Sequence, residues 1–117
     1  MSIERIDAGP RMSAAVVHGD TVYLAGQVAN HAAGKSVAEQ TREILDIIDG
    51  LLARAGTDKT QLLSATIYLA DIRTFAEMNS VWDGWVAQGF TPARATVEAK
   101  LAAPQYTVEI AGIAAKS

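Results

Sequence analysis

One arginine of this sequence, Arg94, lies at a position from which its side chain could bind a ligand. Arg94 follows Thr91-Pro92-Ala93, so a proline fixes the backbone just where a strand over residues 93–100 is predicted to begin. A guanidinium presents a planar fork of donors that binds a carboxylate at two points, which a lysine does not reproduce. The pattern favours a small carboxylate as the ligand of Arg94. The alternative is a structural salt bridge to Glu98 or Glu109, and the spacing leaves both interpretations open.

Three further residues are candidates for the same site. Glu109 lies among apolar residues of the last predicted strand, where it is either partly buried or paired with Arg94. Thr96 follows Arg94 by two positions and could orient a water molecule, although a threonine in a strand is ordinary. Gly26 lies inside a strand pattern, where glycine often marks a close approach of the backbone to another group.

The remaining polar residues predict no second site. His18 and His31 have no ligand-forming neighbour at metal spacing, and the absence of cysteine excludes a thiol nucleophile and disulfides. No phosphate-binding loop, dinucleotide fingerprint or nucleophile elbow is present, so we expect neither a metal nor a cofactor. We expect the acidic residues of the helices to lie on solvent-exposed faces, and we expect Trp82 and Trp85 to be anchors in the core or in an interface.

Size and charge narrow the possible partners. The chain has 117 residues, half of them hydrophobic, which suits a single domain over residues 1–117. Its net charge is −3 and its ten Lys and Arg residues are scattered, so no basic stripe for a nucleic acid is visible. Apolar runs are too short to cross a bilayer, and the first residues lack a signal core. We therefore expect a cytoplasmic protein that binds neither nucleic acid nor membrane.

The elements that must position these residues form the pattern β-β-β-α-β-α-β-β. Capping pairs Ser36/Glu39 and Thr74/Glu77 predict the two helix starts, and Gly56 and Gly89 predict their ends. Right-handed connections would place both helices on one face of a single sheet, an α+β fold. The expected strands cover residues 3–7, 13–17, 21–28, 62–69, 93–100 and 106–114.

Two helices leave the other face of the sheet uncovered. Alternation in the last two strands assigns Ala93, Ala95, Val97 and Ala99, with Val108, Ile110 and Gly112, to the helix side. It assigns Arg94, Thr96 and Glu98, with Thr107, Glu109 and Ala111, to the uncovered side, joined there by Tyr23, Ala25, Gln27, Ser64, Thr66 and Tyr68. This face has too little charge for a solvated one, so we expect copies of the chain to bury it. The alternative is a wet face on a monomer.

Motifs along nearly the whole chain resemble those of the Rid (reactive intermediate deaminase, YjgF-type) family. Ala25-Gly26-Gln27-Val28 is similar to its S-G-Q-[IV] strand. The run from Thr66 to Asp71, followed by Phe75 and Asn79, resembles its T-[VI]-[FY]-[LV]-x-D…F…N block. Pro92-Ala93-Arg94 with Val97, and Val108-Glu109-Ile110 with Ile113-Ala114, resemble its P-A-R-x-x-V…[VI]-E-I…I-A ending.

This resemblance implies a chorismate-mutase-like fold, a homotrimer with sites between subunits, and cofactor-independent hydrolysis of enamines and imines such as 2-aminoacrylate to 2-keto acids and ammonia. It makes Arg94 the residue that holds the substrate carboxylate and adds Asn79 to the site. The chain departs from the family pattern at Met12, Ala25, Thr96 and Ala111, where a tyrosine, a serine, a cysteine and an acidic residue are usual, so it looks like a divergent subgroup. The alternative function is a non-catalytic module that binds a small carboxylate or keto acid.

Overall fold

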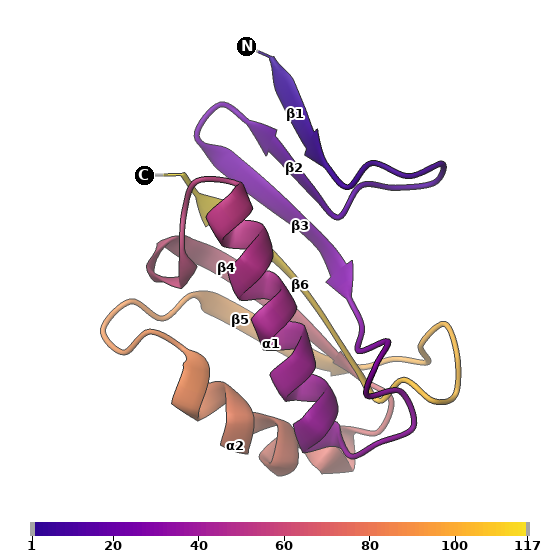
Figure 1. The fold of residues 1–117 in the computed structure, drawn as a ribbon. Coiled ribbons are helices and arrows are strands. Elements are labelled where there is room, and N and C mark those ends of the chain that lie inside the picture. Colours follow the sequence, from indigo (N-terminus) through magenta and orange to yellow (C-terminus); the bar gives the residue numbers. More distant parts are fainter. Residues whose placement is uncertain (1, 117) are drawn as a thin grey trace.

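Residues 2–116, which the computed structural model describes, form a mixed sheet in the order β1-β2-β3-β6-β4-β5 (Figure 1). Only β4 and β5 run parallel to each other, and every other neighbouring pair is antiparallel. The strands are β1 (Ile3–Ile6), β2 (Ala15–His18), β3 (Thr21–Gln27), β4 (Leu62–Leu69), β5 (Ala93–Glu98) and β6 (Val108–Ala115). The predicted order of elements is therefore confirmed.

Helix α1 (Val37–Arg54) begins and ends where its sequence signals predict. The Ser36 hydroxyl accepts a hydrogen bond from the Glu39 amide at 3.1 Å, which satisfies a donor that the first turn leaves unpaired. Gly56 has φ +86°, the left-handed conformation that stops a helix at low cost for glycine. Its buried stripe, which includes Ile44, Leu45 and Leu52, packs onto the sheet.

Helix α2 (Phe75–Trp85) does not use its predicted capping pair. The Thr74 hydroxyl donates to the carbonyl of Asp71, and Thr74 makes no side-chain cap for α2. The Glu77 carboxylate instead accepts from the amide of Ala38 at 2.9 Å, so it caps the neighbouring helix α1. The prediction failed because tertiary contact between the helices offered Glu77 a closer donor. Two 3-10 turns, η1 (Lys59–Gln61) and η2 (Ile72–Thr74), flank β4.

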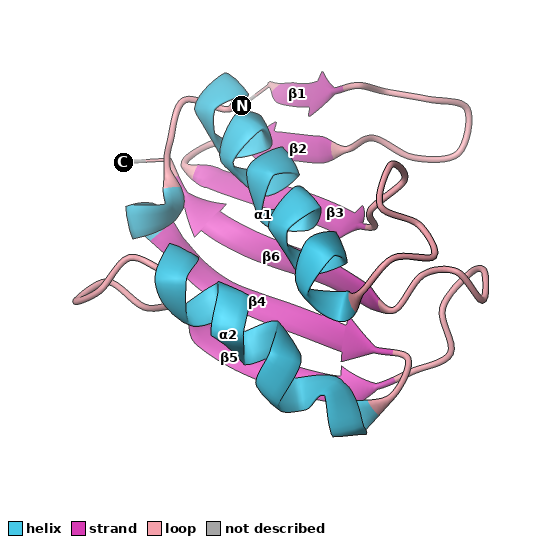
Figure 2. Cartoon of the chain, turned by 60° about the horizontal axis from the view of Figure 1, so that its bottom comes forward, coloured by secondary structure: helices cyan, strands magenta, loops and turns pink. Residues whose placement is uncertain are grey.

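Both helices cover the same face of the sheet, as predicted (Figure 2). The core lies between them and the strands, with Val22, Ile67 and Ile110 from the sheet almost fully buried. Each buried aliphatic side chain of this kind contributes about 1.5–3 kcal/mol. Gln40 of α1 is fully buried as well, and it accepts from the Thr107 amide at 3.0 Å and donates to the Gln105 carbonyl at 2.9 Å. Gln40 therefore fixes the segment before β6 to the start of α1.

The register of β5 corrects the predicted facing of its side chains. Arg94 pairs with Ala65 and Thr96 pairs with Ile67, and both partners are buried beneath the helices. Because paired residues of neighbouring strands project to the same side, Arg94, Thr96 and Glu98 lie on the helix side of the sheet. Ala93, Ala95 and Val97 lie on the uncovered side, and Val97 is 43% exposed there. Apolar alternation misassigned the faces because β5 is an edge strand whose helix side receives polar residues.

Candidate functional site

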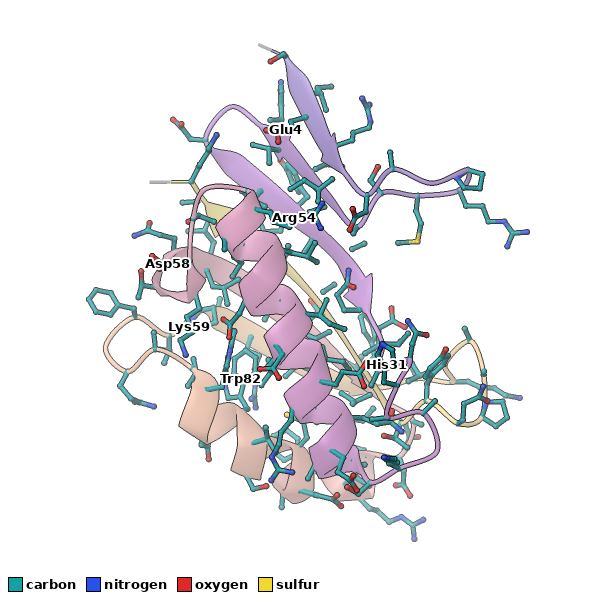
Figure 3. The ribbon with its side chains drawn as sticks, in the orientation of Figure 1. Glu4, His31, Arg54, Asp58, Lys59 and Trp82 are labelled. Atoms are coloured by element: carbon teal, nitrogen blue, oxygen red, sulfur yellow. The ribbon has the colours of Figure 1, made fainter. Side chains whose placement is uncertain are left out.

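The Arg94 guanidinium lies against α2, in a setting of neutral groups. Its Nη1 donates to Asn79 Oδ1 at 2.8 Å. Its central carbon is 5.3 Å from the centre of the Trp82 ring and 5.7 Å from that of Phe75, both within the range of cation–π attraction. Trp82, in the C-terminal half of α2 (Figure 3), is buried and belongs to the core, whereas Phe75 at the start of the helix is 41% exposed.

No carboxylate pairs with Arg94 among residues 2–116. Glu98 lies on the same side of β5, but its Oε1 accepts from the Ile72 amide at 3.0 Å. Glu109 pairs with Tyr68 and therefore projects from the opposite face of the sheet. The interpretation of Arg94 as a structural salt bridge to either residue is wrong in this chain. Arg94 is therefore a partly buried cation whose partners in the described chain are neutral, and a guanidinium in this setting is chemically able to bind a carboxylate.

Glu109 and Gly26 form a second group on the uncovered face. The bulge between Leu24 and Gln27 turns Gly26 toward β6, where a Cβ atom at Gly26 would collide with the Glu109 carboxylate. The predicted close approach at this glycine is thus confirmed, and the approaching group is the Glu109 side chain. The same bulge pairs Gln27 with buried Ile110, so the assignment of Gln27 to the uncovered face is wrong.

The candidate residues therefore fall into two sets on opposite sides of the sheet. Arg94, Asn79 and Thr96 lie on the helix side, and the Thr96 hydroxyl is buried without a hydrogen-bond partner in the described chain. Gly26 and Glu109 lie on the uncovered side. The described chain does not bring all five together.

Sequence reasoning missed the two aromatic rings at Arg94. The sequence predicted Phe75 as a position of the family motif and Trp82 as a core or interface anchor, and it predicted neither as a partner of Arg94. The signal was available in the spacing, because Phe75, Asn79 and Trp82 follow one another by four and three positions and so share one stripe of α2. Recognising the stripe as an arginine site required the correct facing of β5.

A bidentate ion pair holds the loop between β1 and β2. The Arg54 guanidinium, at the end of α1 (Figure 3), donates to both oxygens of Asp7 at 2.8 and 2.9 Å. Asp7 has φ +52°, which is uncommon outside glycine, and this hydrogen bonding lowers the pKa of its carboxyl group. The pair fixes the start of the loop that carries Met12, which lines a cavity of about 320 Å³ with Gly26.

Other parts of the chain carry less chemistry. A cavity of about 660 Å³ lies at the far end of β5 beside Lys100, Leu101 and Tyr106, and Arg94 does not line it. Between residues 2 and 116, no cluster of three or more His, Asp or Glu side chains is arranged to hold a metal ion. His18 and His31 are exposed. Neither described helix is both long and apolar enough to span a membrane.

Comparisons with known proteins place this architecture in one class. The family model described as endoribonuclease L-PSP matches residues 2–116. A crystal structure of a YjgF family member from Neisseria meningitidis superposes with a TM-score of 0.96 at 47% identity, covering 100% of this chain and 97% of that one. A member of the YjgF/YER057c/UK114 family from Mycobacterium tuberculosis gives a TM-score of 0.88 at 28% identity, with 97% and 99% covered.

Sequence relatives agree with the structures. The RutC family protein YoaB of Escherichia coli is 46% identical over 115 residues, which are 98% of this chain and 99% of that protein. A RutC family protein of Haemophilus influenzae is 46% identical over 114 residues, 97% of this chain and 98% of its own length. The chain belongs to the YjgF/RutC/Rid (endoribonuclease L-PSP) family.

Proposed function

We propose that this protein hydrolyses small 2-imino acids, formed from enamines such as 2-aminoacrylate, to 2-keto acids and ammonia. The observation that carries the proposal is Arg94, a partly buried guanidinium with an amide oxygen and two aromatic rings around it but no carboxylate. The resemblance of the motifs to the Rid family is the reason for proposing this class of reaction. The substrate carboxylate would complete the charge pair that the chain itself leaves open.

The proposed chemistry needs orientation and electrostatics rather than a covalent intermediate. Water adds to the carbon of the C=N bond, and the resulting carbinolamine expels ammonia to leave the C=O bond of the keto acid. Arg94 holds the carboxylate in a fixed place beside the reacting carbon, which lowers the entropic part of the barrier. Glu109 is the acidic group proposed to position or activate the water.

The site is proposed to form between subunits of a homotrimer. Arg94 and Glu109 project from opposite faces of one sheet, so a partner would have to bring its own Glu109 to Arg94. The uncovered face suits such burial, because Tyr23 is 47% and Ile113 is 36% exposed on it. Apolar side chains exposed next to each other on one face support burial of that face against a partner. Light scattering should give the mass of three chains, and a monomer would remove the composite site.

The test is ammonia release from freshly generated 2-aminoacrylate. We expect release above the rate of solvent hydrolysis, and Arg94→Ala should lower it by at least tenfold because the carboxylate loses its anchor. Arg73→Ala is the matched control, since Arg73 is exposed and pairs with Asp71 at the surface. A rate equal to solvent hydrolysis, or an unchanged Arg94 variant, would reject the proposal.

A second candidate function is binding of a small carboxylate or keto acid without turnover. It is favoured by Met12, Ala25 and Ala111, which carry no hydroxyl or acidic group where the family usually has one. In that case calorimetry with pyruvate would show heat that depends on Arg94, while ammonia release would stay at the solvent rate. Absence of heat would reject this candidate too.

A further inference from the structure

We propose that Trp82 and Phe75 are positioning residues that hold the Arg94 guanidinium between two aromatic faces. The inference rests on the proposed role of Arg94 and goes beyond it, because it assigns a task to two side chains that would not touch the substrate carboxylate. Both rings lie within 6 Å of the guanidinium carbon, at 5.3 and 5.7 Å. Asn79 lies between them in sequence and binds Nη1.

The three side chains restrict different motions of the guanidinium. The hydrogen bond to Asn79 fixes one end of the fork and leaves rotation about that bond. Rings at two points along the helix limit this rotation, because the cation loses attraction when it leaves a ring face. A guanidinium restrained in this way loses less entropy when a carboxylate binds, so affinity rises without a new contact to the ligand.

The stripe of Phe75, Asn79 and Trp82 on α2 is not buried along its whole length, as a core stripe would be. Trp82 is 6% exposed and Phe75 is 41% exposed, so the rings span the distance from the core to the surface. Trp85 occupies the next turn, and its ring faces Lys59 at 5.1 Å instead of Arg94. Trp85 offers a control variant, because it ends the same helix and its ring lies 5.4 Å from that of Trp82 without being over Arg94.

The experiment separates clamping from simple packing. In Trp82→Leu, we expect the NMR signal of the Arg94 Nε–H group in the ligand-free protein to lose its ring-current shift and gain mobility. Pyruvate affinity should fall about fivefold, within the range of one cation–π contact. Trp82→Phe should restore most of both, since it keeps an aromatic face. Phe75→Leu should give a smaller change, because Phe75 is the more distant and more exposed ring.

The controls keep the result interpretable. Trp85→Leu removes a partly buried tryptophan of the same helix and should leave the Arg94 signal and pyruvate affinity near wild type. If Trp82→Leu and Trp85→Leu change pyruvate affinity equally, or if Arg94 mobility is the same in Trp82→Leu and the wild type, the clamp is refuted. If NMR shows that the rings restrain Arg94 but the protein binds no pyruvate, the restraint by Trp82 and Phe75 is supported and the proposed function of Arg94 is refuted. The two failures are therefore distinguishable.

Discussion

Replacing Asn79 by aspartate tests whether Arg94 is held open for an anion. Asn79→Asp keeps the shape of the side chain and places a negative charge at the oxygen that now lies 2.8 Å from Nη1. At an effective dielectric of about 20 and a charge separation of about 4 Å, the new attraction is about 4 kcal/mol. Solvent at this partly exposed site reduces that figure, and we take about 1–2 kcal/mol as the net gain.

The structure therefore predicts opposite effects on stability and on ligand binding. The internal ion pair should raise the melting temperature by about 3–5 °C, as expected for about 1 kcal/mol in a domain of this size. A net gain of about 1–2 kcal/mol should weaken pyruvate binding by about 5- to 30-fold, because the ligand must compete with the carboxylate of residue 79 for Arg94. Thermal unfolding and titration calorimetry on one sample measure both.

A matched variant guards against an unspecific effect of added charge. Asn30 also accepts a hydrogen bond through its Oδ1, from the Tyr106 hydroxyl at 2.8 Å, but it is exposed and its partner is a neutral hydroxyl instead of a guanidinium. Asn30→Asp should leave pyruvate affinity unchanged. An Asn79→Asp protein that binds pyruvate like the wild type would refute the reasoning, because it would mean that the charge of Arg94 does not serve the ligand.

Three further substitutions test separate parts of the account. In Arg54→Gln, the lowered pKa of Asp7 should return toward its ordinary value near 3.8. The ion pair stabilises the wild type above that pH, and this stability is lost as acid protonates Asp7. A pH series of melting temperatures should show this acid-dependent loss in the wild type and not in Arg54→Gln. Gln40→Leu should lower the free energy of unfolding by about 1–3 kcal/mol in urea titrations, since Gln40 is buried and the partly buried backbone groups that it binds lose their partner. Gly26→Ala should displace the Glu109 carboxylate and reduce ammonia release at least tenfold. The far-UV circular dichroism spectrum should stay unchanged. A turnover equal to that of the wild type would show that Glu109 takes no part in the mechanism.

The sequence predicted the elements well where a local signal decides them. Ser36 and Gly56 bound α1 because capping and left-handed backbone are local properties, and Leu62–Leu69 is the strand that its apolar alternation predicts. The start of α2 was found, but its cap was not, because Glu77 binds an amide of the other helix. That contact lies 39 residues away in sequence, where no local pattern reports it.

The site was predicted as residues but not as an arrangement. Arg94 and Asn79 do meet, whereas Glu109 and Gly26 face the other way. The error came from treating the last two strands as neighbours with a common alternation. In the sheet β4 lies between them, and it fixes the facing of β5 through a parallel register that the sequence of β5 alone does not encode.

The central claim is that Arg94 binds the carboxylate of a small acid, and one titration tests it most directly. Methyl pyruvate has a neutral methyl ester in place of the pyruvate carboxylate, and both compounds are titrated into the wild type and into Arg94→Lys. We predict that the wild type binds pyruvate and not the ester, and that Arg94→Lys binds pyruvate at least tenfold more weakly, because an ammonium lacks the planar fork of donors. Equal binding of acid and ester, or an affinity of Arg94→Lys equal to that of the wild type, would contradict it.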